Sequence, residues 1–551
     1  MSSTQPGRDA AEPDYGSPEG SPGPGTPATG SNGGPQDPSG PAKPATDPQA
    51  LDRGLLLVAA CVVLGAIMSI LDVTVVNVAL PQLVNDFESN LATIQWVATG
   101  YTLALATVIP LTGWGAERFG TKRLYMTSIF LFVVGSVLSG LAWNDTSLIF
   151  FRILQGLGGG MVMPAGMTIL TRAAGPQRLG RVMAVMGVPM LLGPILGPIL
   201  GGWLVEDFSW RWIFFINAPI GALALVMCFR ILPKDVPTPG HRLDWLGLAL
   251  LSPGLALLIY GLAESSEEGG FGHAIVLVPM LAGALLLAAF VAHALRRGDD
   301  ALIDLRLFTN KVFAASSVTM LLMIISVFGG MLLLPLYLQQ VRLEGAFDTG
   351  LLLAPQGVGA MIAMPIAGTL VDRTGVGRVA PVGLLCVALS FVGLTRITAD
   401  TGYWELSGYL FLMGVGMGFS MMPLMTGAMQ TLRRNAVAKA STTLNIIQQT
   451  GSSIGTAVMV VILTAAISDR IPGAGSMGPE SAGAATDAQA PDPAAVQQML
   501  NLMAEAFGHT FWWAAGMVAI AFVVALVLLP KRKPQLSEED SAEMQAHMMM
   551  G

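Results

Sequence analysis

The sequence predicts an all-α polytopic membrane protein with fourteen transmembrane helices: two six-helix bundles and two further helices inserted between them. Three observations predict this fold, namely the composition, the number of apolar runs and an internal repeat. Of 551 residues, 53% are hydrophobic and only 12% are charged. Soluble domains carry about 25% charged residues, so most of this chain is expected to lie in lipid.

Fourteen apolar runs are long enough to cross the hydrocarbon layer, which is about 30 Å thick. They cover residues 54–80, 92–112, 123–143, 147–170, 181–205, 212–232, 243–263, 274–295, 312–340, 349–371, 379–398, 405–428, 441–467 and 510–530. The segment 1–50 before the first run is rich in Pro, Gly and Ser, which predicts a disordered tail. An even number of spans places both termini on the same side of the membrane.

The distribution of basic residues predicts which side that is. With the N-terminus inside, 24 of the 29 Lys and Arg residues fall on the cytoplasmic side and four in outer loops, while Arg152 lies within a span. This split follows the positive-inside rule. We therefore expect a multi-pass protein of the cytoplasmic membrane with both termini in the cytoplasm.

Two loops eight spans apart repeat one pattern. GWGAERFGTKR follows the second run and GTLVDRTGVGR follows the tenth, with glycine, acid, arginine, glycine and arginine at identical offsets. These positions are Gly113, Glu117, Arg118, Gly120 and Arg123 in the first loop and Gly368, Asp372, Arg373, Gly375 and Arg378 in the second. Such a repeat indicates two related halves.

Because the repeated loops are eight spans apart and not six, two additional helices are predicted between the halves. The predicted parts are a cytoplasmic tail 1–50, a six-helix bundle 51–235, two linker helices 236–300, a second six-helix bundle 301–530 with an outer loop 468–510, and a cytoplasmic tail 531–551. Within the outer loop, apolar residues at helical spacing from Val496 to Phe507 predict a short amphipathic helix lying on the outer surface.

Several motifs resemble the major facilitator superfamily and, within it, the fourteen-helix drug:proton antiporter branch of EmrB/QacA-type multidrug exporters. They are the loop GWGAERFGTKR, LDVTVVNVALP (71–81), QWVATGYTLA (95–104), RILQGLGGG (152–160) and WRWIFFINAPIG (210–221). The resemblance covers about 54–530 and implies a central cavity that opens alternately to either side. Glu117 departs from the usual Asp, and Gln448 and Gln449 stand where Arg is common.

Two lone charges are the candidates for proton coupling and substrate recognition. Asp72 is the one acid placed deep within a span, and Arg152 is the matching base, with Gln155 on the same helix face. An intramembrane charge is costly and is therefore a candidate functional site. Arg does not release its proton, so Asp72 is the candidate proton carrier. The alternative is a structural ion pair, and the sequence alone does not decide whether the two residues pair.

The glycine-rich run GPILGPILGG in the fifth span has a low helix propensity, because Pro in a helix interior costs about 3 kcal/mol and Gly about 1 kcal/mol relative to Ala. It resembles the signature that distinguishes antiporters, and its candidate residues are Gly193, Pro194, Gly197, Pro198, Gly201 and Gly202. Glycines at every fourth position predict close helix packing. The second half keeps Gly451 and Gly455, 258 residues further on, but not the prolines.

The charges of the two repeated loops are candidates for a cytoplasmic gate that latches helix ends in one state. The alternative is that the basic residues Arg118, Lys122 and Arg123 only fix the topology. The candidate cavity residues are Trp96, Tyr101, Met413, Met417, Asn445, Gln448 and Gln449. Polar or aromatic side chains could line a wet cavity, and flexible Met suits adaptable apolar binding. Interhelical packing, or anchoring at the interface for the aromatic residues, is the alternative for each.

No GxxxxGK[ST] motif is present, so an ion gradient and not ATP is the expected energy source, with no cofactor or metal. The expected activity is proton-coupled export of amphipathic organic compounds by a monomer that binds no nucleic acid. One alternative is an exporter of a lipid or a self-made metabolite. A receptor or membrane enzyme is disfavoured, because the spans offer no nucleophile–base pair or paired carboxylates.

Overall fold

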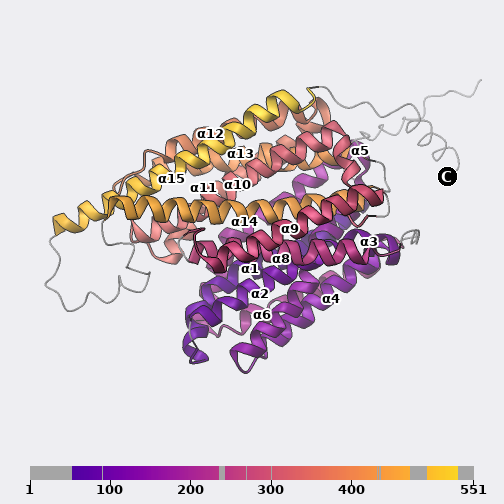
Figure 1. Cartoon of the computed structure of the whole chain (residues 1–551), viewed down its shortest axis with the longest axis horizontal. Coiled ribbons are helices and arrows are strands. Elements are labelled where there is room, and N and C mark those ends of the chain that lie inside the picture. The colour runs from indigo at the N-terminus through magenta and orange to yellow at the C-terminus, as the bar shows by residue number, and fades with distance from the viewer. Residues whose placement is uncertain are drawn as a thin grey trace, which may run out of the picture. The chain divides into compact units, whose positions relative to one another are not determined.

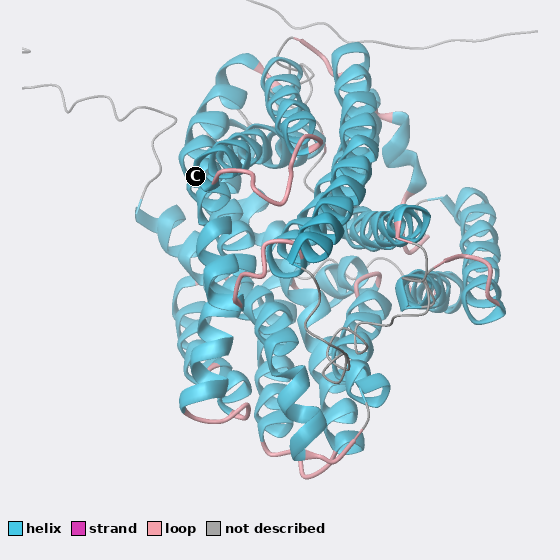
Figure 2. Ribbon diagram, turned by 90° about the vertical axis from the view of Figure 1, so that its left-hand side faces the viewer, coloured by secondary structure: helices cyan, strands magenta, loops and turns pink. Residues whose placement is uncertain are grey.

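The computed structural model describes residues 53–89, 91–234, 242–267, 270–298, 301–430, 432, 436–471 and 493–531. Within these ranges the regular elements are helices and no strand forms (Figure 2). By their internal contacts, residues 1–48 and residues 49–551 form two separate units. All of the described residues belong to the second unit. The expected tail 1–50, nearly all of the tail 531–551 and the centre of the loop 468–510 lie outside them.

The helices follow the apolar runs of the sequence. We name three groups of helices after the predicted parts of the chain. By this naming the first half contains α1 (Arg53–Asp86), α2 (Leu91–Val108), α3 (Leu111–Phe119), α4 (Thr121–Gly140), α5 (Asp145–Asp207), α6 (Trp212–Phe215) and α7 (Asn217–Ile231). The inserted pair is α8 (Trp245–Glu267) and α9 (Ala274–Arg297). The second half contains the 3-10 helix η2 (Leu305–Thr309), α10 (Lys311–Gln340), α11 (Ala346–Thr374), α12 (Val376–Leu394), α13 (Tyr403–Gln430), α14 (Val437–Arg470) and α15 (Pro493–Leu528).

Twelve helices of the described chain are long and apolar enough to cross a membrane, and thirteen if α2 and α3 count as one span bent by 55°. An all-helical fold of twelve to thirteen spans agrees with the predicted class. The count of fourteen is not reached, because the expected span 181–205 lies in the part of α5 in which many side chains are not described.

Helix α5 passes α1 twice, in opposite directions. A straight helix of its 63 residues would be about 95 Å long, three times the hydrocarbon thickness. On the first pass, later residues of α5 meet earlier residues of α1, and on the second pass the order is reversed. The contacts are Arg152 with Asp72 and Gly166 with Val62 on the first pass, and Gly193 with Ile70 and Gly201 with Val75 on the second.

The two repeated segments are mostly helical, which corrects the prediction that they are loops. Helix α3 continues to Phe119 and α11 to Thr374, and each ends at one glycine. Gly120 has φ 88° and ψ 146°, and Gly375 has φ 89° and ψ 159°, a region that L side chains rarely adopt. The chain therefore turns at these glycines, and we call the end of the bundle at which they lie the loop end.

The predicted amphipathic helix of the outer loop is not a separate element. Residues from Pro493 onward form one continuous helix with the last span, α15. Val496 and Met499 are exposed, whereas Phe507 is buried with its ring 5.8 Å from that of Tyr337, edge to face. The apolar spacing correctly predicted a helix, but this helix is continuous with the last span and runs through Gly508.

Helices within each half pack mainly on one another, and α8 lies between the halves (Figure 1). In the first half α5 contacts α1, α2 and α4, and in the second half α13 contacts α11 and α12 while α10 contacts α14 and α15. Helix α8 contacts α2 on one side and α14 on the other. One large apolar core, with Phe132 and Phe391 among its fully buried members, extends through both halves.

Candidate functional site: a buried ion pair in the first half

A buried polar cluster lies in the first half where α1, α5 and α7 meet. Arg152 Nη1 donates a hydrogen bond to Asp72 Oδ2 over 2.6 Å. Gln155 Nε2 and Asn217 Nδ2 both donate to Asp72 Oδ1, over 2.7 and 3.1 Å. Asp72 is 2% exposed and Arg152 is 1% exposed. We call these four residues the Asp72 cluster.

The Arg152 guanidinium group makes further contacts besides the ion pair. Nη1 also donates to Gln155 Oε1 over 2.8 Å, and Nε donates to the carbonyl oxygen of Val97 over 3.1 Å. The Arg152 Cζ atom lies 4.2 Å from the centre of the Tyr101 ring, a cation–π distance. Further hydrogen bonds of this kind offset the cost of burying a charged pair.

Glycines bring the helices close enough to form the cluster. A Cβ on Gly135 of α4 would lie 2.6 Å from Gln155 Cα, and one on Gly156 of α5 would lie 2.5 Å from the Tyr101 carbonyl oxygen. Any side chain at these positions would push α4 or α2 away from α5. The glycines of RILQGLGGG therefore place Arg152 and Gln155 at the centre of the first half.

The cluster combines one group that can gain a proton with one that cannot lose one. Asp72 and Arg152 neutralise each other, which removes most of the cost of two charges in an apolar interior. Protonation of Asp72 would leave Arg152 without a counter-ion, and an uncompensated buried charge costs roughly 3–5 kcal/mol. Among the described residues, no group of three or more His, Cys, Asp or Glu could hold a metal ion.

The structure brings together Asp72, Arg152, Gln155 and Tyr101 from the predicted set. Sequence reasoning missed Asn217 and the neighbouring Ser136, whose Oγ accepts from Asn217 Nδ2 over 3.0 Å. The available signal was a carboxamide inside the apolar motif WRWIFFINAPIG. Its distance from Asp72 along the chain, 145 residues, gave no hint of contact.

The other candidate cavity residues lie apart from this cluster. Trp96 is 40% exposed and stacks on Tyr260 of the inserted pair, with 5.9 Å between ring centroids. Asn445 donates to the Ser441 carbonyl oxygen of its own helix over 2.9 Å, and Gln448 and Gln449 are half-buried. Two further candidates lie in the apolar core, Met413 at 0% and Met417 at 2% exposed.

The glycine face of GPILGPILGG packs on α1 next to Asp72. A Cβ on Gly193 or Gly197 would collide with Ile70 or Thr74 respectively, and Thr74 Oγ1 donates to the Gly193 carbonyl oxygen over 3.2 Å. Gly201 also lies against α1, whereas no atom would lie within 4 Å of a Cβ on Gly202. The side chains of Pro194 and Pro198 lie outside the described residues.

At the loop end, the two equivalent acids differ in burial. Asp372 is 2% exposed and accepts a hydrogen bond from Gln430 Nε2 over 3.3 Å, whereas Glu117 is half-buried beside a pocket. The four arginines are exposed: Arg118, Arg123, Arg373 and Arg378. Of the two equivalent glycines, Gly368 is buried, and a Cβ on Gly113 would lie 3.4 Å from Thr442 Oγ1 of α14.

Two groups of apolar helices, with glycine turns repeated at one end and the Asp72–Arg152 pair buried between helices, are typical of a polytopic membrane transporter. The chain belongs to the Major Facilitator Superfamily, whose family model matches residues 62–456. The expected family is confirmed.

Curated relatives align over most of the chain. A protein named multidrug resistance protein B homolog from Mycobacterium tuberculosis (strain ATCC 25618 / H37Rv) is 44% identical over 489 residues, covering 88% of this chain and 89% of that protein. The tetracenomycin C resistance and export protein of Streptomyces glaucescens is 30% identical over 503 residues, covering 88% and 92%. The multidrug export protein EmrB of Haemophilus influenzae is 30% identical over 413 residues, covering 75% and 81%.

Solved structures share the fold at low sequence identity. The human organic anion transporter MFSD10 (TETRAN) matches with a TM-score of 0.61 at 16% identity, over 86% of this chain and all of that one. The proton:xylose symporter XylE matches with a TM-score of 0.56 at 16% identity, over 89% and 98%. At this identity the likeness concerns the fold alone.

Proposed function

We propose that the protein exports amphipathic organic compounds, such as drugs, antiseptics or antibiotics, across the cytoplasmic membrane in exchange for protons. The observation that carries this proposal is the buried Asp72–Arg152 pair in a superfamily member whose relatives are named for multidrug resistance and export. No cofactor is required, since the proton gradient supplies the energy. The protein works as a monomer.

Topology is part of the proposal. The second pass of α5 along α1 supplies the span missing from the count, which gives fourteen. The predicted division into two six-helix bundles, an inserted pair and two tails is retained. The loop end, with its exposed arginines, then lies in the cytoplasm together with both termini.

Alternating access is supported by contacts that join the halves at the loop end. Ser441 Oγ of α14 donates to the Pro164 carbonyl oxygen of α5 over 2.9 Å. Thr171 Oγ1 of α5 lies 3.2 Å from Met429 Sδ of α13, and these two residues are 258 positions apart, the offset of the internal repeat. Two residues at equivalent positions of the two halves that contact each other lie close to the approximate two-fold axis relating the halves. The loop end is closed here, as expected for an outward-facing state.

In the proposed cycle a proton from outside neutralises Asp72 and releases Arg152 from it. The uncompensated guanidinium then favours a state in which α1 and α5 have moved relative to each other. Because the glycine face of α5 packs on α1 within one turn of Asp72, the movement reaches this interface directly. Substrate bound from the inner side promotes release of the proton, which completes the exchange.

The test is pH-gradient-driven transport in proteoliposomes, assayed with a panel of cationic and neutral dyes, antiseptics and antibiotics. Asp72→Asn should abolish gradient-driven transport while the protein still folds and inserts. Asp348→Asn, which removes an exposed acid of α11, is the matched control and should transport normally. Normal gradient-driven transport by folded Asp72→Asn protein would refute the coupling role of Asp72.

A second candidate is export of a self-made antibiotic, favoured by the relative named for tetracenomycin C resistance and export. The two candidates differ in breadth of substrate. Thermal-shift measurements against a chemically diverse panel should give many weak responses for a multidrug exporter and one strong response for a dedicated exporter.

A further inference from the structure

The inserted pair α8–α9 contacts both halves near the loop end. Ser252 Oγ of α8 donates to the Thr107 carbonyl oxygen of α2 over 2.7 Å. An apolar cluster of α8, α9 and the segment after α9 also takes in Trp114 of α3 and Ile446 of α14. The pair therefore rests on the first and second halves together.

Helices α3 and α14 form a seam between the halves at the loop end. A Cβ on Gly113 of α3 would lie 3.4 Å from Thr442 Oγ1 and 3.6 Å from Lys439 Cα of α14. Alternating access requires this seam to separate when the loop end opens. Contacts that span the seam therefore favour the closed state.

One carboxylate organises the inserted pair at this end. Asp244 caps the start of α8 by accepting from the Gly247 backbone N–H over 3.0 Å, and its side chain is 1% exposed. It also contacts His293 Nε2 of α9 at 2.9 Å and Arg297 Nη1 at 3.4 Å. The backbone N–H of Leu302, on the segment that leads into the second half, donates over 3.4 Å. Asp244 thus contacts both inserted helices and the segment after α9 at Leu302.

Asp244 stays ionised under physiological conditions. Burial acts to raise its pKa, but hydrogen bonds from the Gly247 backbone and His293, together with the charges of His293 and Arg297, outweigh burial and hold the pKa below the ordinary 3.8. The contacts of this carboxylate are therefore those of an anion. Asparagine would retain its shape and lose the charge.

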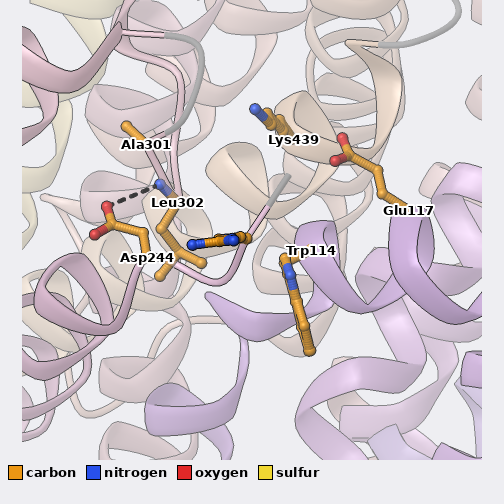
Figure 3. Close-up of a pocket in the computed structure, with 7 residues that line it drawn as sticks. Trp114, Glu117, Asp244, Ala301, Leu302 and Lys439 are labelled. Atoms are coloured by element: carbon orange, nitrogen blue, oxygen red, sulfur yellow. Dashed lines mark hydrogen bonds between the residues drawn. The ribbon is translucent and has the colours of Figure 1, made fainter. Parts of the chain in front are cut away.

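A small pocket separates Asp244 from the seam. Asp244 and Leu302 line one side of it, and Trp114, Glu117 and Lys439 line the side formed by α3 and α14 (Figure 3). We propose that Asp244 is a positioning residue that holds the inserted pair across the α3–α14 seam and thereby favours the closed loop end. This inference rests on the alternating access of the proposed function.

The test measures the ratio of open to closed loop ends by electron–electron double resonance in the full-length protein. Spin labels are placed at Thr127 and Val382, which are exposed, equivalent in the two halves and clear of the seam. The three native cysteines, which are buried or half-buried, are first replaced. The distance between the two labels is measured at neutral and at acidic pH, in the parent protein and in each variant.

Asp244→Asn should raise the open-to-closed ratio at least threefold. His293→Gln keeps a hydrogen-bond donor beside Asp244 and should raise the ratio less. This variant supplies the test if Asp244→Asn does not fold. Asp304→Asn is the matched control, because Asp304 also caps a helix by accepting from the Arg306 backbone N–H over 2.9 Å, but it does not line the pocket.

An unchanged ratio in folded variants, or an equal shift in Asp304→Asn, would overturn the role of Asp244 even where the parent shows two distances. A parent that shows one distance under every condition would instead overturn alternating access itself, and this inference with it. The two failures are therefore distinguishable.

Discussion

The two halves of the molecule share their turns and differ in their charges. Gly120 and Gly375 have nearly the same backbone angles, and Gly197 of the first half corresponds to Gly455 of the second. The position equivalent to Arg152 is Leu410, which is fully buried. The duplicated features are those that close helices onto one another, whereas the ion pair belongs to the first half alone. The repeated pattern thus accounts for the helix turns and close helix packing, whereas the Asp72–Arg152 pair has no equivalent at Leu410.

The largest expected difference between the halves concerns the ion pair. Asp72→Asn should lower the free energy of unfolding by about 3–5 kcal/mol, because it leaves a buried Arg that cannot lose its charge. Arg152→Leu copies the second half and should cost less, because Asp72 can take up a proton. The double variant should return to within about 1 kcal/mol of the parent and still lack gradient-driven transport. The measurement is unfolding in mixed detergent micelles, and additive single effects would contradict an interacting pair.

A smaller difference is expected at the equivalent packing glycines. A Cβ on Gly455 would lie 2.2 Å from the carbonyl oxygen of Ile325 in α10, whereas one on Gly197 would lie 2.0 Å from Thr74 Oγ1 and 2.5 Å from Thr74 Cβ. Rotation of the Thr74 side chain moves Oγ1 but not Cβ, so it relieves only part of the overlap at Gly197. Gly455→Ala should therefore destabilise the protein by about 1–3 kcal/mol and Gly197→Ala by less.

Both substitutions gain the same helix propensity, so the comparison isolates packing. Gly202→Ala is the control, because its Cβ would meet nothing within 4 Å; it should gain up to about 1 kcal/mol. Thermal unfolding in one detergent ranks the three variants. Equal losses at Gly197 and Gly455 would show that the Thr74 side chain is as rigid as backbone.

The smallest difference is expected at the turns. Ala at Gly120 or Gly375 must adopt a φ near +90°, which costs roughly 1–3 kcal/mol. Because the backbone angles agree, the two losses should match within about 0.5 kcal/mol by thermal unfolding. Unequal losses would mean that the two turns carry different strain despite their common pattern.

The sequence predicted the helices and the charged part of the site. Asp72 and Arg152 stood out because an ionised group in an apolar span is expensive, and Gln155 followed from helical spacing. Asn217 was missed because an uncharged carboxamide costs far less and leaves a weaker signal. Pairing across 80 residues, as between Asp72 and Arg152, depends on tertiary packing that the spacing of residues does not encode.

The positions of turns and helix ends were predicted least accurately. The glycine, acid and arginine pattern was assigned to loops, although a helix can contain all three residue types up to the final glycine. The segment before the last span was assigned to a surface helix, because apolar periodicity does not report whether two helical segments are collinear. Both errors concern where a helix ends, which is decided by backbone angles at single residues.

The order of the ion pair along the chain bears on biosynthesis. Asp72 enters the membrane 80 residues before Arg152 is made. The span that carries Asp72 must therefore insert without its partner, and its most apolar 18-residue window has a mean hydropathy of 2.7, among the highest of the described spans. The first-pass span of α5 reaches only 1.4 and carries an arginine that costs about 3 kcal/mol to insert. Because the acid is made first, we expect it to offer that arginine a partner on arrival and so to assist the membrane insertion of the later helix.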